Sequence, residues 1–476
     1  MIDQQTDETT ITNSGTIIGT VGPGIDFSGL TPEITITSLA KIPNDPTIIN
    51  SGLISGANGI AVDFGNTDPD TLILQTGGKF IGDVKFGGGT NTFDFSGYHG
   101  NMLFGVDANG GAITTLNAGS NLYVNDVANN QIAIVDDTAI RNAAQPVEDL
   151  VGGIQGSVAD ALNGSAVGAG GDQNFVAEYA ATRPATPAAR AAMTMGVKPV
   201  VAGPTLWGEV FGGGDSNSSG AGSNTNFGGL VAGTQGEWVP GFTVGVLASY
   251  GRTNFNVTNG PQTVTGDTGV VGIYGKTSLD TIGLDFSLLG GFGSNSSKRQ
   301  ISTGTGTETA TASFNSWFFA PEIGASMPVL RTGNGQFNLA GKLGYIGGNF
   351  AGYTETGSTA NATVGSENIG IFDAKLELNG NTVVHSGGVG DVTVTGKLGL
   401  FAQTNAGGAS AVPVSVLGLP TAGSSASGAN GYGVYAGAGV DMPVSNGFTV
   451  GASVLGSARS DGDYAGIGKL RISGSY

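Results

Sequence analysis

The chain ends in Tyr464-Ala-Gly-Ile-Gly-Lys-Leu-Arg-Ile-Ser-Gly-Ser-Tyr476, a stretch in which apolar and polar side chains alternate. With the two-residue period of a strand, one face holds Tyr464, Leu470, Ile472 and Tyr476, and the other holds Lys469, Arg471, Ser473 and Ser475. One face suits lipid and the other suits water. Strands can cross a bilayer only as a closed barrel, because closure pairs every backbone N–H and C=O group. The stretch therefore predicts one strand of a transmembrane β-barrel.

The same alternation recurs throughout residues 205–476, in segments of about ten residues separated by turn-rich stretches. The segments begin near Leu206, Phe227, Phe242, Gly269, Gly283, Phe314, Phe337, Glu367, Asp391, Gly431, Phe448 and Tyr464. These make twelve strands, and an even number is what a single-chain bacterial barrel requires. Short turns such as Pro240-Gly241 are expected on the periplasmic side, and the longer loops 294–312, 350–366 and 406–430 on the exterior.

The phase of each segment separates lipid-facing from pore-lining positions. Outward positions include Phe242, Leu284, Phe372 and Val450, and several segments begin or end with an aromatic residue, as at a membrane interface. The pore-lining positions carry charges of both signs: Lys276, Asp285, Glu322, Lys342, Asp373, Lys375, Glu377, Lys397, Lys469 and Arg471. We expect a polar pore of roughly balanced charge.

Residues 1–141 contain an internal repeat. Ile11-Thr-Asn-Ser-Gly-Thr-Ile-Ile-Gly19 recurs as Ile48-Ile-Asn-Ser-Gly-Leu-Ile-Ser-Gly56, and the same offset of 37 carries Asp26-Phe27 onto Asp63-Phe64. Short β-branched runs separated by Asn and Gly are typical of a parallel β-solenoid, whose stacked rungs bury Ile and Val. The fold class is therefore all-β, with a parallel β-solenoid segment and a short helical and linker segment before the antiparallel barrel.

Residues 142–204 differ in composition from the parts on either side. After Pro146, apolar residues recur at helical spacing, at Val147, Leu150, Val151, Ile154, Val158 and Leu162, and Asn163-Gly164 is a suitable end for this helix. Residues 182–204 hold Pro184, Pro187, Pro199 and Pro204 and are expected to be an extended linker.

Composition excludes several classes of protein. The 476 residues carry a net charge of −18, which excludes a basic stripe for nucleic acid, and no continuous apolar run could form a spanning helix. The lack of Cys excludes disulfides and thiolate metal sites, and fits a chain that crosses an oxidising periplasm unfolded. The opening Met1-Ile-Asp-Gln-Gln has no signal-peptide features, so we expect a fragment or a start that lies upstream.

The order of these parts resembles the autotransporters, the self-translocating proteins of Gram-negative outer membranes (type V secretion). Local markers are Leu206-Trp-Gly-Glu-Val-Phe-Gly212 in the first strand, Gly228-Gly-Leu-Val-Ala-Gly233 in the second, Phe319-Ala-Pro-Glu-Ile-Gly324 in the sixth and the terminal Ile472-Ser-Gly-Ser-Tyr476. The resemblance covers essentially the whole chain. It implies that the barrel is a translocator in the outer membrane and that the solenoid is the end of a passenger at the cell surface.

The resemblance also implies roles for particular segments. Tyr476, with Ile472 and Leu470, would be the signal read by the barrel-assembly machinery, and periplasmic chaperones would be further partners. One segment would thread the pore, and the sequence leaves open whether this is 146–163 or 175–195. The ligand of the passenger is unknown, and an adhesin-like role is the expectation.

Residues for catalysis are scarce. The only histidines are His99 and His385, neither in a catalytic or metal-binding pattern, so no enzymatic activity, metal or cofactor is expected. Asn129-Asn130 is either a polar loop or a passenger release site. The leading hypothesis is an outer-membrane autotransporter, and the alternative is a porin-like channel with an N-terminal surface cap. An enzymatic passenger upstream is outside this sequence.

Overall fold

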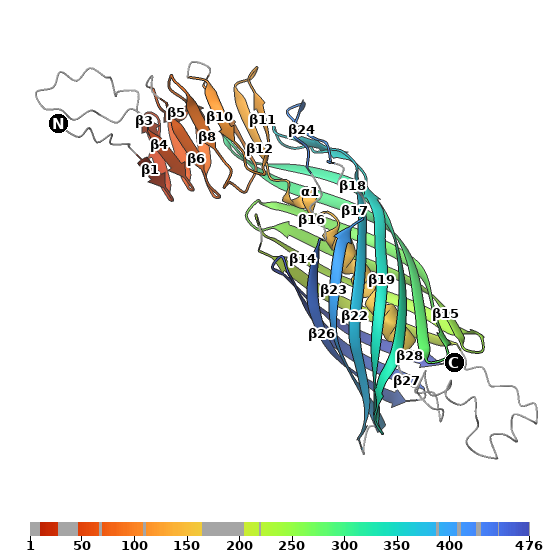
Figure 1. Ribbon diagram of the computed structural model, residues 1–476. Coiled ribbons are helices and arrows are strands. Elements are labelled where there is room, and N and C mark those ends of the chain that lie inside the picture. The colour runs from red at the N-terminus through yellow and green to blue at the C-terminus, as the bar shows by residue number, and fades with distance from the viewer. Residues whose placement is uncertain are drawn as a thin grey trace, which may run out of the picture.

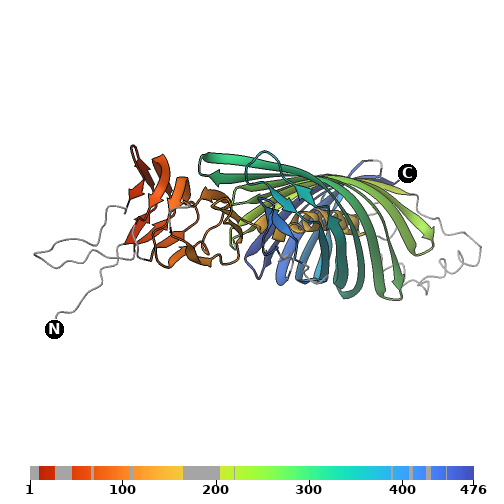
Figure 2. The ribbon, with the colours of Figure 1, turned by 90° about the horizontal axis from the view of Figure 1, so that it is seen from above.

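The structure is a computed structural model that describes residues 10–26, 46–65, 69–107, 111–163, 204–218, 220–386, 390–406, 411–424, 430–445 and 447–475. Along the chain, a stack of parallel strands is followed by two helices and then by a large barrel (Figure 1). The view in Figure 2 shows the longer helix running inside the curved wall of the barrel.

The barrel is a ring of antiparallel strands. Its members are β13 (Thr205–Asn217), β14 (Ser223–Val239), β15 (Phe242–Val257), β16 (Gln262–Leu279), β17 (Ile282–Thr303), β18 (Gly306–Arg331), β19 (Gly335–Phe350), β22 (Glu367–Ser386), β23 (Gly390–Asn405), β26 (Gly431–Ser445), β27 (Phe448–Arg459) and β28 (Asp463–Ser475). The first strand pairs with the last, from Thr205 opposite Ser475 to Asn217 opposite Asp463, and this pairing closes the ring. The prediction of twelve antiparallel strands is confirmed.

The two ends of the barrel differ in their connections. At the short-turn end, strands are joined by tight turns such as 240–241, 280–281 and 332–334. At the long-loop end, the connections include 351–366 and 406–430, which contain the short strands β20 (Tyr353–Thr354), β21 (Ala362–Val364), β24 (Val414–Val416) and β25 (Leu419–Pro420). These four strands pair into one small sheet.

The prediction of a long loop at residues 294–312 is wrong. β17 and β18 run through this region as paired strands of 22 and 26 residues, with only 304–305 between them. A Ser-, Thr- and Gly-rich segment can form a strand in water when a neighbouring strand pairs with it, and composition alone does not reveal that partner. A crossing needs about 9–11 residues, so the hairpin projects beyond the membrane.

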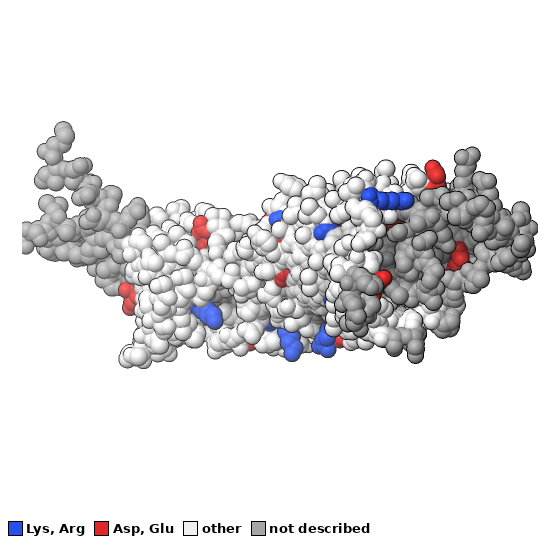
Figure 3. Space-filling view, turned by 90° about the horizontal axis from the view of Figure 1, so that it is seen from below, with Lys and Arg blue, Asp and Glu red and all other residues white. Residues whose placement is uncertain are grey.

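Side chains alternate between the pore and the outer surface as a barrel requires. On β15, β17 and β27, Val246, Leu288 and Val454 are exposed, whereas Leu247 and Leu289 are buried inside. Charged side chains are few on the side of the molecule seen in Figure 3. Within the described residues, neither helix is long and apolar enough to cross a membrane.

Some inward glycines make room for aromatic rings of the next strand. Gly245 lies opposite Tyr274, and a Cβ atom on Gly245 would lie 2.2 Å from the Tyr274 ring. Gly399 and Tyr435 repeat the arrangement, with a corresponding distance of 2.3 Å. A glycine has no side chain to pack, so the ring of its partner covers the gap.

The N-terminal part consists of two parallel sheets. One contains β1 (Thr10–Asn13), β4 (Thr47–Asn50), β6 (Thr71–Leu74), β8 (Asn91–Asp94) and β10 (Ile113–Asn117), and the other contains β2 (Thr16–Gly19), β3 (Ile25–Asp26), β5 (Leu53–Asp63) and β7 (Lys79–Lys85). Ile11 pairs with Ile48, Ile17 with Ile54 and Asp26 with Asp63. The offset of 37 seen in the sequence is therefore the offset between the first stacked strands of each sheet, whereas Thr47 pairs with Thr71 and Thr71 with Thr92.

The parallel stack joins the barrel through a small antiparallel sheet. This sheet contains β9 (Met102–Gly105), β11 (Leu122–Asp126) and β12 (Gln131–Val135), and β9 pairs with the projecting end of β17 at Ser302 and Thr303. The chain then enters the barrel through α1 (Thr138–Arg141) and α2 (Gln145–Asn163). The helix predicted over 146–163 thus matches α2, whereas 175–195 lies outside the described residues.

Candidate functional site: a helix in the barrel pore

The apolar face of α2 packs against the inner wall of the barrel. Its six predicted apolar positions, Val147, Leu150, Val151, Ile154, Val158 and Leu162, are all buried in one cluster. The wall supplies Phe211, Val231, Leu247, Val270 and Leu289 to the same cluster. A 19-residue helix is about 28 Å long, which is close to the thickness of the hydrocarbon core of a bilayer. α2 therefore occupies the pore over most of its length.

Two glycines on the helix let it lie close to the wall. A Cβ atom on Gly153 would lie 2.8 Å from the Phe211 ring, and one on Gly156 would lie 2.4 Å from Lys469 Nζ. Gly152, their neighbour, faces open space. The Gly152-Gly153 pair lowers helix propensity, but Gly153 is needed for this close contact.

A network of charges holds the polar face of α2 to β13 and β28. Lys469 Nζ lies 3.2 Å from Asp160 of the helix and 3.4 Å from Glu209 of the wall. Ser157 Oγ donates a hydrogen bond to Glu209 Oε1 at 2.5 Å. Both Glu209 and Ser157 are buried, so the network compensates charges that would otherwise be costly inside the protein.

Barrel side chains also contact both ends of the helix. At its C-terminal end, Gln235 Nε2 donates to the Ala161 carbonyl at 2.9 Å, Lys276 Nζ donates to that of Leu162, and Arg471 Nη1 donates to that of Asp160. At its N-terminal end, Gln145 Nε2 donates to Asp215 and to Asp463, the latter at 3.1 Å, and Gln403 Nε2 donates to Glu148. The helix is therefore attached near both ends of the pore.

On the part of the wall formed by β18, β19 and β22, charged side chains of opposite sign pair with one another. Glu322 lies 3.4 Å from Lys342 and 3.5 Å from Lys375, and Lys375 lies 3.0 Å from Asp373. Tyr435 donates a hydrogen bond to Glu377 at 2.7 Å. Such a closed network needs no counter-charge from the helix, and it accounts for the balanced composition of the predicted pore lining.

A collar of loops covers the long-loop end of the pore. The collar consists of residues 351–366 and 411–424, the projecting end of β17 and residues 101–107 and 111–141, which share one apolar cluster. Within it, Arg299 pairs with Glu355 at 2.5 Å, and its guanidinium also donates to Asn101 at 3.2 Å. These bonds join the barrel wall, a loop and the N-terminal part.

A second polar contact in the collar fixes the start of α1. Asp137 pairs with Arg141 at 2.9 Å and accepts a hydrogen bond from Ser424 of the loop at 2.8 Å. Burial raises the pKa of Asp137 above its usual range, although Arg141 and Ser424 favour the charged form. The chain is thus anchored where it enters the pore.

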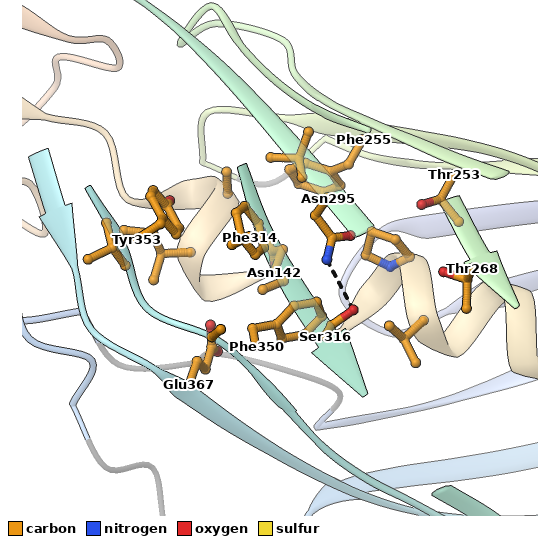
Figure 4. Close-up of a pocket in the computed structure, with 18 of the residues that line it drawn as sticks. Asn142, Thr253, Phe255, Thr268, Asn295, Phe314, Ser316, Phe350, Tyr353 and Glu367 are labelled. Atoms are coloured by element: carbon orange, nitrogen blue, oxygen red, sulfur yellow. Dashed lines mark hydrogen bonds between the residues drawn. The ribbon is translucent and has the colours of Figure 1, made fainter. Parts of the chain in front are cut away.

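A cavity of about 50 Å³ lies between the start of α2 and the wall, as Figure 4 shows. Its lining is mostly apolar, with rings such as Phe314 and Phe350, and Asn295 donates to Ser316 at 3.0 Å at its edge. Glu367 is buried there, and its Oε1 atom has no hydrogen-bond partner among the described residues. The space suits a few water molecules at the junction of helix and wall.

The structure brings most of the residues predicted for the site together. The predicted pore-lining residues lie on inward-facing positions, and Lys276, Lys469 and Arg471 contact α2. Leu470 and Ile472 of the predicted assembly signal are exposed on the outer face of β28, and Tyr476 lies outside the described residues. His99 lies in the connection between β8 and β9, and no group of His, Cys, Asp or Glu among the described residues could hold a metal ion.

Sequence reasoning missed several residues that hold the helix. Glu209 shares the inward phase of Trp207 and Phe211, so the alternation of the first strand could have identified it. Gln235 and Asp463 lie near strand ends, where the apolar pattern fades. No sequence signal connects them to residues of α2 that are far away in the chain.

Comparisons with known proteins identify the family of the barrel through a family model. The family model for the autotransporter beta-domain matches residues 206–455. No curated protein matches the chain. Similar solved structures include the translocator domain of the autotransporter NalP from Neisseria meningitidis, with 15% identity and a TM-score of 0.48, covering 63% of this chain and 99% of that one. The beta domain of the Bordetella autotransporter BrkA has 15% identity and a TM-score of 0.42, covering 58% and 100%. The transport unit of AIDA-I from Escherichia coli has 16% identity and a TM-score of 0.41, covering 59% and 92%.

Proposed function

Since this chain belongs to the autotransporter family, we propose that α2 is the segment that stays in the pore after the N-terminal part has reached the cell surface. The barrel is an outer-membrane translocator and is not itself an enzyme. In this proposal, residues 205–476 form the translocator, 142–204 thread and link, and 1–141 are the end of the passenger. The observation that carries it is the attachment of α2 at both ends of the pore.

The arrangement at the long-loop end supports the proposed direction of transport. The parallel stack, the collar and the longer loops lie at one end, and short turns are characteristic of the periplasmic side. The chain passes from the parallel stack through the collar into the pore, with the N-terminus of α2 nearest the collar. This is the order expected of a passenger that has moved outward and remains attached.

The proposed partners follow from the family and the exposed surface. The outward face of β28, with Leu470 and Ile472, is proposed to meet lipid and to be read by the barrel-assembly machinery. Periplasmic chaperones are proposed to hold the chain before assembly. The passenger is proposed to be adhesin-like and without enzymatic activity, because His99 is the one histidine in residues 1–141 and belongs to no catalytic pattern.

Conductance in a planar bilayer tests whether α2 fills the pore. The full chain is expected to conduct poorly, and removal of residues 1–204 should raise the conductance sharply because it removes the helix. Removal of residues 1–137 is the matched control, because it deletes the parallel stack and keeps α1 and α2. Equal conductance of the full chain and the chain lacking 1–204 would favour a porin-like channel and contradict the proposal.

A further inference from the structure

The last turn of α2 needs hydrogen-bond donors from outside the helix. An α-helix leaves its last four carbonyl groups without partners, and here these belong to Asp160, Ala161, Leu162 and Asn163. Basic side chains in the last turn often bind such carbonyls, but α2 has none there. Ala161 and Leu162 are buried, so unpaired carbonyls at this position would destabilise the seated helix.

Three strands of the barrel supply donors to this turn. β14 contributes Gln235, β16 contributes Lys276 and β28 contributes Arg471, and each donates to a different carbonyl. Two of these donors are cations, which are favourable at the negative end of the helix dipole. Arg471 is itself held at 2.7 Å by Asp441 of β26, so its guanidinium is oriented before the helix arrives.

The opposite end of the pore has the complementary charge. Asp215 and Asp463 of the wall are buried beside Gln145, at the positive end of the helix dipole. The wall therefore presents two buried carboxylates beside the N-terminus of α2, with Arg459 paired to Asp463, and two cations to its C-terminus. In a helix inserted in the reverse direction, the unpaired N–H groups would face Lys276 and Arg471, which cannot accept hydrogen bonds.

We propose that Gln235, Lys276 and Arg471 form a binding site for the C-terminal end of an α-helix, a carbonyl clamp that recognises backbone rather than side chains. The proposal rests on the proposed function, in which α2 is the last segment to enter the pore. Every residue has a carbonyl group, so the clamp sets where and in which direction a helix stops, whatever the sequence of its last turn. Asp160 and Ser157 add side-chain contacts, but they do not define the end of the helix.

Thiol labelling of full-length protein tests the clamp. The natural chain has no Cys, so Val158→Cys introduces the only thiol, at a position buried in the seated helix. The rate at which this thiol reacts with a maleimide reports how often α2 dissociates from the barrel wall. Gln235→Glu replaces a donor with an acceptor of the same size, and Lys276→Met removes the ammonium and keeps an unbranched side chain that is one atom shorter. Each is expected to raise the labelling rate about tenfold, the effect of losing one strong hydrogen bond.

Two variants serve as matched comparisons. Gln336→Glu makes the same change at an inward glutamine near the same end of the barrel, where the amide contacts Asn338 of its own strand. Asp160→Asn removes a side-chain charge of α2 and keeps its carbonyl. Gln336→Glu is expected to label nearly as slowly as the Val158→Cys parent. Asp160→Asn weakens the ion pair with Lys469, so it is expected to label faster than the parent but more slowly than the clamp variants. Migration of unboiled samples in a detergent gel shows whether the barrel of each variant has closed. If the barrel of Gln235→Glu does not close, Lys276→Met alone tests the clamp.

The outcomes separate the clamp from the proposed function. Labelling of the clamp variants that is faster than that of both comparison variants supports the clamp. Slow labelling of Lys276→Met, or labelling of Asp160→Asn that exceeds that of the clamp variants, overturns it. If the Val158→Cys parent itself reacts as fast as an unfolded chain, then α2 does not occupy the pore. This result would contradict the proposed function, on which the clamp depends.

Discussion

Replacing Arg299 with Met is expected to destabilise the collar by roughly 3–5 kcal/mol, because it leaves the Glu355 carboxylate buried and unpaired. The side chains of Arg299 and Glu355 are only 3% and 2% exposed. Arg299 also donates to Asn101 and to the carbonyl of Ala360, so one substitution removes bonds to the N-terminal part and to the loop.

Hydrogen exchange at the Ala362 amide measures this effect, since that amide donates to Glu355 at 2.8 Å. The free energy of opening at Ala362 should fall in the variant, while amides in the centre of the barrel keep their protection. Arg252→Met is the matched control, because Arg252 forms an exposed ion pair with Asp267 and such pairs contribute little. A loss below about 1 kcal/mol for Arg299→Met would show that the ion pair does not hold the collar together.

Placing Arg at Val454 is expected to cost roughly 2–4 kcal/mol of barrel stability, because this position faces lipid near the middle of the membrane. Val454 is 64% exposed and lies midway along β27, between Phe448 at one end and Arg459 at the other. The charged group must leave water at this depth. The free energy of unfolding in lipid vesicles, measured with urea, reports the cost.

Val450 is the matched position for this test. It lies on the same face of the same strand, two residues from the start of β27, where a charge can reach the interface. Val450→Arg is therefore expected to cost only about 0–1 kcal/mol. Equal costs at Val454 and Val450 would mean that β27 does not cross the membrane with the depth assigned to it.

The features that depend on a local period could be predicted from the sequence. Alternation along strands such as 448–459 revealed both their existence and their outward faces, because each side chain reports its own environment. The offset of 37 predicted which N-terminal segments stack, since stacked rungs meet equivalent residues. The apolar spacing from Val147 to Leu162 predicted a helix for the same reason.

The features that depend on distant partners could not be predicted. The projecting hairpin of β17 and β18 has the composition of a loop, and only the pairing between its strands makes it regular. Arg299 and Glu355 are polar residues in Ser-, Thr- and Gly-rich surroundings, a pattern typical of exposed loops, yet packing of the collar buries them. The bonds from Gln235 and Arg471 to backbone carbonyls leave no side-chain pattern in α2 at all.

The central claim is that this chain carries its N-terminal part to the cell surface and keeps it attached there. An epitope inserted in the exposed turn beside Val127, between β11 and β12, tests it in living cells. A matched epitope in the turn 240–241 marks the opposite end of the barrel. Antibody is expected to bind the first epitope on intact cells, and to bind the second only after the outer membrane is permeabilised. Binding of the second but not the first on intact cells would contradict it.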